Sequence, residues 1–228
     1  MPGPAEAPPS TVAADGLDEA ACWDPAALAG RLVEITSGGA WGLPGRPPGA
    51  LPAIWDVATT RPLGSAALTA ASTLVWKAQQ LGEPAAWIGA RASCFYPPDF
   101  AAGGIDLGAL VVVRVADASA AARAADKLLR SGAFGLVVLD LGPCASVAAP
   151  LVSRLLGLAQ KHRAAVVFLT EKPGDAASLS PMVSLRVVAT RQRGAVARFA
   201  CRVRATKDKR RAPGWTVEET FRGPPGLR

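Results

Sequence analysis

The chain has 228 residues, of which 50% are hydrophobic, and its formal charge is +7 at pH 7. This length is enough for one α/β domain with tails and for a sizeable core. We expect no transmembrane helix, because no apolar run reaches about eighteen residues. We also expect no signal peptide, because the start MPGPAEAPPSTVAADG lacks basic and apolar regions, and the expected location is the cytoplasm.

The first part of the chain is predicted to be rich in loops. Residues 1–24 are rich in Pro and Ala and are expected to be disordered, ahead of a core domain over 25–213 and a tail over 214–228. The elements expected here are a short helix over 25–30 capped by Asp24, a loop over 37–53, a strand over 54–58 and a helix over 65–81 that ends at Gly82.

Strands and helices alternate in the next part of the chain. Continuous apolar runs predict strands over 85–89, 110–115, 135–141 and 164–170. Helices are predicted over 118–131, where Asp117 is the N-cap, and over 147–163. Apolar strands joined by helices are typical of a parallel sheet that helices cover on both faces, so the sequence predicts an α/β fold.

The pattern changes after residue 183. Residues 183–190 and 195–205 alternate with period two, which predicts a hairpin at one edge of the sheet. In the second strand the two faces differ: one carries Phe199, Cys201 and Val203, and the other carries Arg198, Arg202 and Arg204.

The positive charge is concentrated in this same region. Residues 186–211 contain ten Lys and Arg residues, and Asp208 is their only acid. Such a segment indicates a polyanion or an acidic protein surface as the partner. The alternative is a solvated sheet edge in a protein with a basic bias.

Classical catalytic and metal sites are not expected. The four cysteines are scattered without a paired spacing, so buried reduced thiols are favoured over a zinc site. His162 is the only histidine, and at a predicted helix end it suits the helix dipole better than catalysis. No Ser-His-Asp set or Cys-His pair can be assembled.

Several segments resemble RecA in their order along the chain. LLRSGAFGLVVLDL (residues 128–141) resembles the RecA core around its Walker B strand, and RLVEITSGG (31–39) and GALPAIWDVA (49–58) resemble the segments before the phosphate loop. VSLRVVATRQ (183–192) and CRVRATKDKRRAP (201–213) resemble the RecA hairpin and its turn. The similarity covers roughly residues 30–213.

Within the RecA-like proteins, the short Ala-rich chain is similar to the ImuA family of translesion-synthesis accessory proteins. The resemblance implies a RecA-like, P-loop NTPase-type fold: a mostly parallel sheet sandwiched by helices, which a C-terminal β-hairpin extends. It implies a role in the bacterial DNA-damage (SOS) response, with RecA or an ImuB-type polymerase accessory protein as partner. A SulA-like cell-division inhibitor is the related alternative.

The phosphate loop implied by the resemblance is degenerate. The residues from Thr59 to Ala66 match the template G-x-x-x-x-G-K-[ST] only at Gly64. Thr59 replaces the first glycine, Ser65 replaces the lysine that neutralises phosphate charge, and Ala66 replaces the hydroxyl that holds Mg²⁺. We therefore expect no nucleotide cofactor and no metal.

Other positions of the implied ATPase site are also altered. The catalytic glutamate falls on Arg91, whereas Asp140 keeps the Walker B position. Phe100 takes the place of the aromatic that stacks on adenine, although packing under a loop is the favoured role. Thr170 and Glu171 replace the nucleotide-sensing pair, so ATP hydrolysis is not expected and the protein is predicted not to be an enzyme.

The predicted interaction sites lie in the basic segment. The loops after Asp140 and Thr170 are short and poor in cations, so the hairpin is the better candidate for binding DNA or a partner; any DNA binding should be weak and sequence-independent. The candidate residues are Arg198, Arg202, Arg204, Lys207, Lys209, Arg210 and Arg211. We expect the partner to contact the segment before Arg31 and the basic hairpin with its turn, Lys207 to Arg211. The alternative is a weak DNA-binding module with residual nucleotide binding.

Overall fold

The structure is a computed structural model of the chain, and it describes residues 19–37, 66–91, 93, 95–143, 145–172, 175–193 and 198–222. The predicted strand over 54–58 lies outside the described residues, as do Thr59, Gly64, Ser65 and nearly all of the predicted loop over 37–53.

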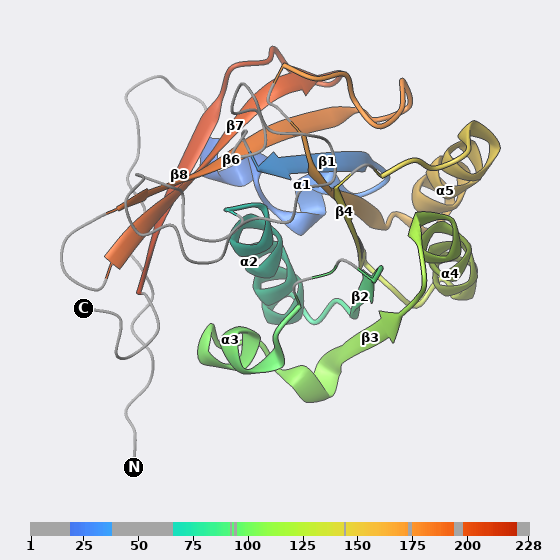
Figure 1. The fold of residues 1–228 in the computed structure, drawn as a ribbon, viewed down its shortest axis with the longest axis horizontal. Helices are drawn as coiled ribbons and strands as arrows, with labels where there is room; N and C mark the ends of the chain where they lie inside the picture. Colours follow the sequence, from blue (N-terminus) through green and yellow to red (C-terminus); the bar gives the residue numbers. More distant parts are fainter. Residues whose placement is uncertain are drawn as a thin grey trace.

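The described chain forms one eight-stranded sheet with the strand order β3-β2-β4-β5-β1-β6-β7-β8 (Figure 1). The strands are β1 (Leu32–Ser37), β2 (Ala85–Gly89), β3 (Leu110–Arg114), β4 (Leu136–Pro143), β5 (Ala165–Glu171), β6 (Leu185–Arg193), β7 (Arg198–Asp208) and β8 (Thr216–Arg222). The first six strands of this order, β3, β2, β4, β5, β1 and β6, pair in parallel. Strand β7 pairs antiparallel with β6, and β8 pairs antiparallel with β7. The predicted α/β class with a mostly parallel sheet is confirmed.

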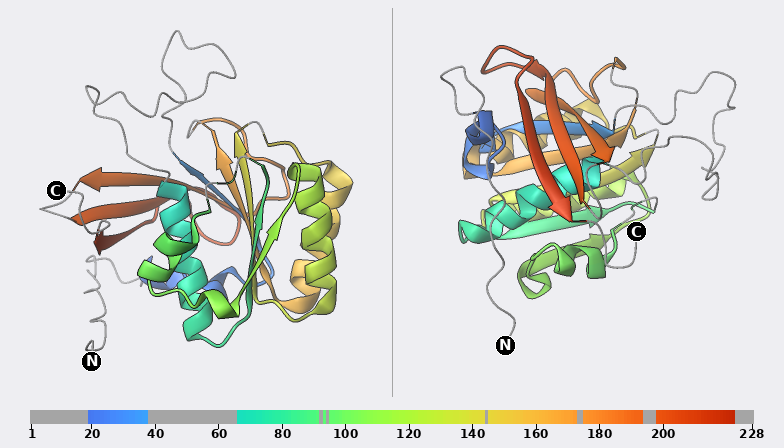
Figure 2. Two further views of the ribbon diagram at one scale, coloured as in Figure 1. Left: turned by 60° about the horizontal axis from the view of Figure 1, so that its bottom comes forward. Right: turned by 90° about the vertical axis from the view of Figure 1, so that its left-hand side faces the viewer.

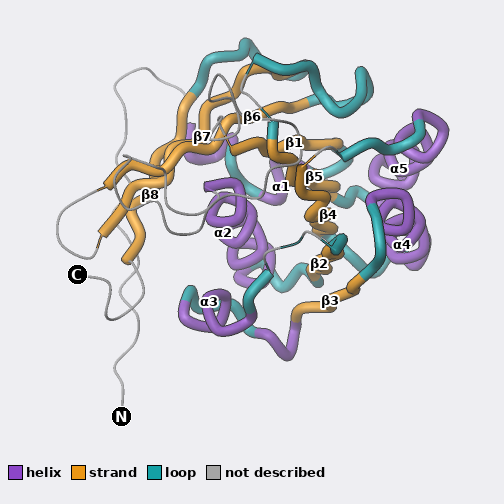
Figure 3. The backbone as a smooth tube through the Cα atoms, viewed as in Figure 1, coloured by secondary structure: helices purple, strands orange, loops and turns teal. Residues whose placement is uncertain are grey.

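Helices cover the parallel part of the sheet on both faces (Figure 2). They are α1 (Pro25–Leu28), α2 (Ala66–Gln80), α3 (Pro97–Ala102), α4 (Ala118–Ser131) and α5 (Ala149–His162), with 3-10 turns η1 (Glu19–Cys22) and η2 (Leu107–Ala109). The tube in Figure 3 separates α2 and α3 on one side of the strands from α4 and α5 on the other. None of the described helices is long and apolar enough to cross a membrane.

Alternating strand residues build two hydrophobic cores. On β4, Val138 packs into the core under α2, and its neighbour Leu139 packs into the core under α4 and α5. Both side chains are fully buried, which is why this strand is a continuous apolar run. Strands β7 and β8 contribute to the α2 core only, through residues such as Cys201, Val203 and Val217.

The helix boundaries follow their capping residues. Asp117 accepts a hydrogen bond from the Ala120 amide at 2.7 Å, and Asp24 accepts one from Ala26 at 2.9 Å, so both predicted N-caps are confirmed. Gly132 ends α4 in the left-handed conformation with φ 70°. A β-carbon at Gly132 would lie 2.8 Å from Nδ1 of His162, so the α4 end packs against the α5 end.

Strands β1 and β8 and turn η1 are among the parts of the fold that were not expected from the sequence. Strand β1 lies in the segment RLVEITSGG, which was singled out only for its resemblance, and it occupies the middle of the sheet. Strand β8 lies within residues 214–228, which were assigned to a tail. Turn η1 and the buried Trp23, which is 1% exposed, lie within the first 24 residues.

Candidate functional site

The carboxyl ends of β4 and β5 lie beside the start of α2. A small hollow of about 20 Å³ is lined there by Ala67, Leu68, Asp140, Gly142, Leu169, Thr170 and Glu171. Such a space holds roughly one water molecule. The structure thus brings Asp140, Thr170 and Glu171 together beside the first turn of α2.

Asp140 is bound to the end of β2. Its carboxylate is buried, at 6% exposure, and Oδ2 accepts a hydrogen bond from the Ser93 hydroxyl at 2.6 Å. Its backbone carbonyl accepts a hydrogen bond from the Ala90 amide at 3.0 Å. Arg91 follows Ala90 directly and lies in an exposed turn beside this edge.

The hydroxyl group of Thr170 donates a hydrogen bond to the side chain of Glu34. Its Oγ1 lies 3.0 Å from Oε1 of Glu34, a carboxylate with 0% exposure that the sequence reasoning did not consider. Glu34 also pairs with Lys172 Nζ at 2.6 Å and accepts a hydrogen bond from the Leu179 amide at 2.8 Å. A buried carboxylate needs such partners, and here they fix the segment after β5 against β1. The sequence signal that could have indicated Glu34 is the presence of an acidic residue within the apolar run RLVEIT.

Phe100 has a packing role in the described structure. It is 6% exposed, and its ring centroid lies 5.0 Å from Trp87 in an edge-on arrangement and 4.4 Å from Phe95. These rings belong to the core under α2. The favoured prediction for Phe100 is confirmed.

Both cysteines that the structure describes, Cys22 and Cys201, are buried. Cys22 is 7% exposed and Cys201 is 3% exposed. Burial raises the pKa of the Cys201 thiol to about 12, and Glu219 nearby acts in the same direction, so this thiol remains protonated and unreactive at neutral pH. Among the described residues, no three His, Cys, Asp or Glu side chains are grouped to hold a metal ion.

The basic residues of β7 lie on the face that was predicted for them. Arg198, Arg202 and Arg204 are exposed, whereas Cys201 and Val203 on the other face are buried, so the predicted alternation is confirmed. The neighbouring strand β8 adds two charges to the exposed face that the sequence reasoning did not assign to the sheet. Glu218 lies opposite Arg202, and Arg222 lies opposite Arg198.

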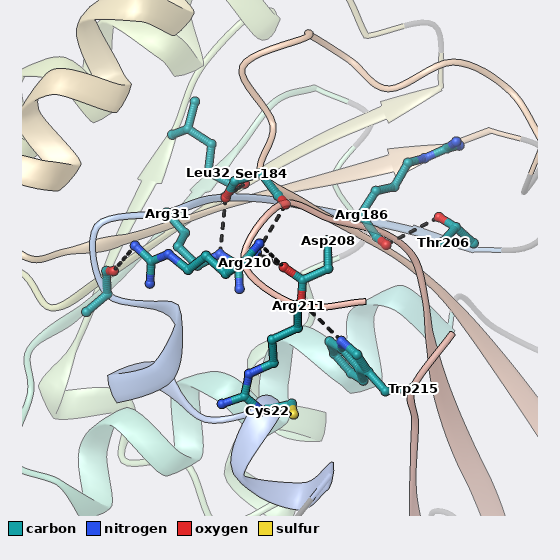
Figure 4. A network of polar contacts seen from close by, with 11 residues as sticks. Cys22, Arg31, Leu32, Ser184, Arg186, Thr206, Asp208, Arg210, Arg211 and Trp215 are labelled. Atoms are coloured by element: carbon teal, nitrogen blue, oxygen red, sulfur yellow. Dashed lines mark hydrogen bonds and ion pairs between the residues drawn. The ribbon is translucent and has the colours of Figure 1, made fainter. Parts of the chain in front are cut away.

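The basic turn, which we define as Lys207 to Arg211, makes contacts within the protein (Figure 4). Lys209 Nζ donates to the Pro181 carbonyl at 2.7 Å. Arg210 donates to the Ala29 carbonyl at 3.3 Å, and Arg211 donates to Cys22 Sγ at 2.6 Å. The three residues are exposed, but their side chains also tie the turn to the N-terminal segment and to the segment before β6.

A buried ion pair lies beneath the basic turn. Arg31 and Asp208 approach to 2.6 Å with side-chain exposures of 5% and 1%, and the Trp215 indole donates to the same carboxylate at 3.1 Å (Figure 4). Arg31 also donates to the Ser184 hydroxyl and carbonyl, each at 3.1 Å. The pair therefore joins the start of β1, the start of β6 and the end of β7.

The buried pair perturbs the titration of both partners. Burial alone would raise the pKa of Asp208, but hydrogen bonds from the Arg210 amide, Trp215 and Arg31 together lower it below its usual value. Burial lowers the pKa of Arg31, an effect that Asp208 opposes. Burial also lowers the pKa of Lys207, with the charge of Lys209 as the next cause.

These features define an α/β protein whose mostly parallel sheet is extended by antiparallel C-terminal strands. Comparison of the sequence with models of known protein families gives no match, and comparison with the sequences of characterised proteins gives none either.

Proposed function

We propose that this protein is a non-catalytic, RecA-like accessory protein of the bacterial DNA-damage response that supports or regulates translesion DNA synthesis. In this role it binds RecA or an ImuB-type polymerase accessory protein without needing ATP. The resemblance of its segments to RecA and to the ImuA family motivates the choice of partners.

The observation that carries the proposal is the chemistry of the edge beside α2. The described residues that line the hollow include the carboxylates Asp140 and Glu171 and no Lys, Arg or His. A triphosphate needs cations and backbone amides around it, and neighbouring carboxylates repel its negative charge. Ala66, the first residue of α2, has no hydroxyl for Mg²⁺, and the space holds about one water molecule.

A protein that keeps a packed α/β core but lacks the groups for binding a nucleotide beside α2 can still bind other proteins through its surface. The N-terminal segment from η1 to α1 is held against the rest of the fold by Arg210 and Arg211. Ala20 and Ala21 of this segment are exposed, and they directly precede Cys22, which Arg211 contacts. A partner with an acidic surface can contact these alanines and the basic turn together.

The first test compares nucleotide chemistry with partner binding. Purified RecA and an ImuB-type protein are titrated with this protein, with and without Mg-ATP. The expected result is a complex with one of them that is insensitive to ATP, no ATPase activity above background, and no Mg-ATP affinity tighter than millimolar. The double variant Ser65→Lys/Ala66→Thr is expected to remain inactive, because Arg91 still occupies the position of the general base. Micromolar Mg-ATP binding by calorimetry would contradict the proposal.

The second test locates the partner surface without breaking a described hydrogen bond. The variant Ala20→Glu/Ala21→Glu adds two negative charges beside the basic turn and is expected to weaken the complex at least tenfold. The matched control Ala101→Glu/Ala102→Glu makes the same change at two exposed alanines of α3 and should bind like the parent. Equal effects of the two variants would exclude the N-terminal segment as the contact surface.

A further inference from the structure

One face of the C-terminal strands is exposed and strongly basic. We call it the basic sheet face, and it consists of the residues of β6, β7 and β8 that point away from α2. Its exposed members are Thr190, Gln192, Arg198, Arg202, Arg204, Glu218, Thr220 and Arg222, together with the half-buried Ala200 and Thr216.

No described helix covers this face. The core under α4 and α5 contains no residue of β6, β7 or β8, whereas the core under α2 contains residues of all three. In Figure 2 these strands extend away from α4 and α5. A sheet face that no helix covers is normally polar, and a mixture of acidic and basic residues would be polar enough. Exposure alone therefore does not explain why this face is basic.

The charges of the basic sheet face are not balanced. Four arginines face one carboxylate, that of Glu218, which lies 2.7 Å from Arg202. Arg198 and Arg222 are direct cross-strand neighbours, an arrangement that is unfavourable for like charges. No carboxylate among the described residues pairs with Arg198, Arg204 or Arg222. An anion bound between these side chains would relieve the repulsion.

The composition of the face selects the kind of anion. Protein interfaces are centred on buried aromatic or aliphatic anchors, and this face presents none: Val188 is 7% exposed and Ala200 is small. Guanidinium groups fit phosphate oxygens, and Thr and Gln side chains add hydrogen bonds to a sugar–phosphate backbone. Without an aromatic side chain on the face, bases cannot be stacked against it.

We infer that the basic sheet face binds the phosphate backbone of single-stranded nucleic acid, without preference for base sequence. A flexible single strand can follow the twist of three strands, so several phosphates can meet the arginines at once. Binding at this face is independent of the protein contacts proposed above, which use the N-terminal segment and the basic turn.

The test is fluorescence anisotropy with a labelled oligo-dT strand of about 20 nucleotides and the full-length protein. Three or four phosphate contacts give a slope of log K against log salt of about −2 to −3, hence a fall in affinity of roughly 15- to 60-fold between about 50 and 200 mM salt. A strand of mixed sequence should bind within about twofold of oligo-dT. Absence of binding near 50 mM salt, or a slope near zero, overturns the inference.

Two matched variants locate the site. Arg198→Gln/Arg204→Gln/Arg222→Gln should lose at least tenfold in affinity and reduce the magnitude of the slope by about 2. Arg123→Gln/Lys127→Gln/Lys161→Gln removes the same charge from exposed positions on α4 and α5 and should bind like the parent. If both variants lose affinity equally, only the net charge matters and the inference is wrong.

A third variant distinguishes loss of the binding site from misfolding, because it is expected to increase the affinity. Glu218→Gln removes the carboxylate of the basic sheet face and releases Arg202. Affinity for oligo-dT should therefore rise about two- to fivefold, with a slope steeper by about 0.7. A misfolded protein cannot produce such a gain, and unchanged or weaker binding would contradict the role of this face.

Discussion

The basic turn and the β7 part of the basic sheet face come from one continuous stretch of basic sequence, yet their cations have different surroundings in the fold. In the turn, Lys209, Arg210 and Arg211 donate hydrogen bonds to other segments of the same chain. On the face, Arg198, Arg204 and Arg222 lie exposed, and no carboxylate among the described residues forms an ion pair with them. A count of charges does not separate cations that hold segments of the chain together from cations that are left exposed; their contacts in the folded protein do.

The largest expected effect is at the ion pair beneath the basic turn. Asp208→Ala leaves the guanidinium of Arg31, which is 5% exposed, without its counter-charge. Removing one partner of a buried pair costs about 3–5 kcal/mol of the free energy of unfolding. Urea unfolding followed by circular dichroism measures this cost. A cost below about 1 kcal/mol would show that the turn is not fixed by this pair.

The same pair predicts sensitivity to acid. The folded-state pKa of Asp208 is lowered, so its carboxylate stabilises the fold above its unfolded pKa of about 3.9 and loses this contribution as the pH falls through the folded value. The free energy of unfolding should therefore decrease on acidification below about pH 4. In Asp208→Asn this decrease should be smaller, and an identical pH profile would assign the acid sensitivity to other groups.

Much of the fold could be predicted from the sequence because its signals are local. The continuous apolar runs of β2, β4 and β5 and the capping residues Asp24 and Asp117 depend on neighbours in the chain. Strand β8 is different: its residues Thr216–Arg222 alternate in polarity only weakly, and it is held by pairing with β7. Its place in the sheet depends on a tertiary contact that no local pattern reports.

The candidate sites show the same division. The alternation along β7 places Arg198, Arg202 and Arg204 on one face, and this could be predicted from period two alone. The internal contacts of the basic turn could not, because Arg211 and Cys22 are far apart in the sequence. Arg31 and Glu34 were missed for the same reason: their partners come from distant segments of the chain.

A smaller effect is expected from the side chains of the basic turn. Arg210→Gln/Arg211→Gln removes two exposed contacts with the N-terminal segment and should cost about 1 kcal/mol. Limited proteolysis should then cut the chain before β1 faster than in the parent. An unchanged cleavage rate would mean that the buried Trp23 and Leu28 hold this segment without help from the turn.

The smallest effect is expected at the exposed pair of the basic sheet face. Arg202 and Glu218 have side-chain exposures of 44% and 42%, so solvent screens their attraction. Glu218→Gln should change the free energy of unfolding by less than about 0.5 kcal/mol. A cost comparable with that of Asp208→Ala would remove the distinction between the two regions.

The most direct test of the difference between the basic turn and the basic sheet face compares two triple variants. Each variant replaces three cations of one region by Gln. Arg198→Gln/Arg204→Gln/Arg222→Gln should lose oligo-dT binding at least tenfold and unfold in urea like the parent. Lys209→Gln/Arg210→Gln/Arg211→Gln should be destabilised by about 1–2 kcal/mol, from three lost hydrogen bonds, and should keep oligo-dT affinity within about threefold. If the turn variant loses the binding and the face variant loses the stability, the two sets of cations have the opposite roles and the account is contradicted.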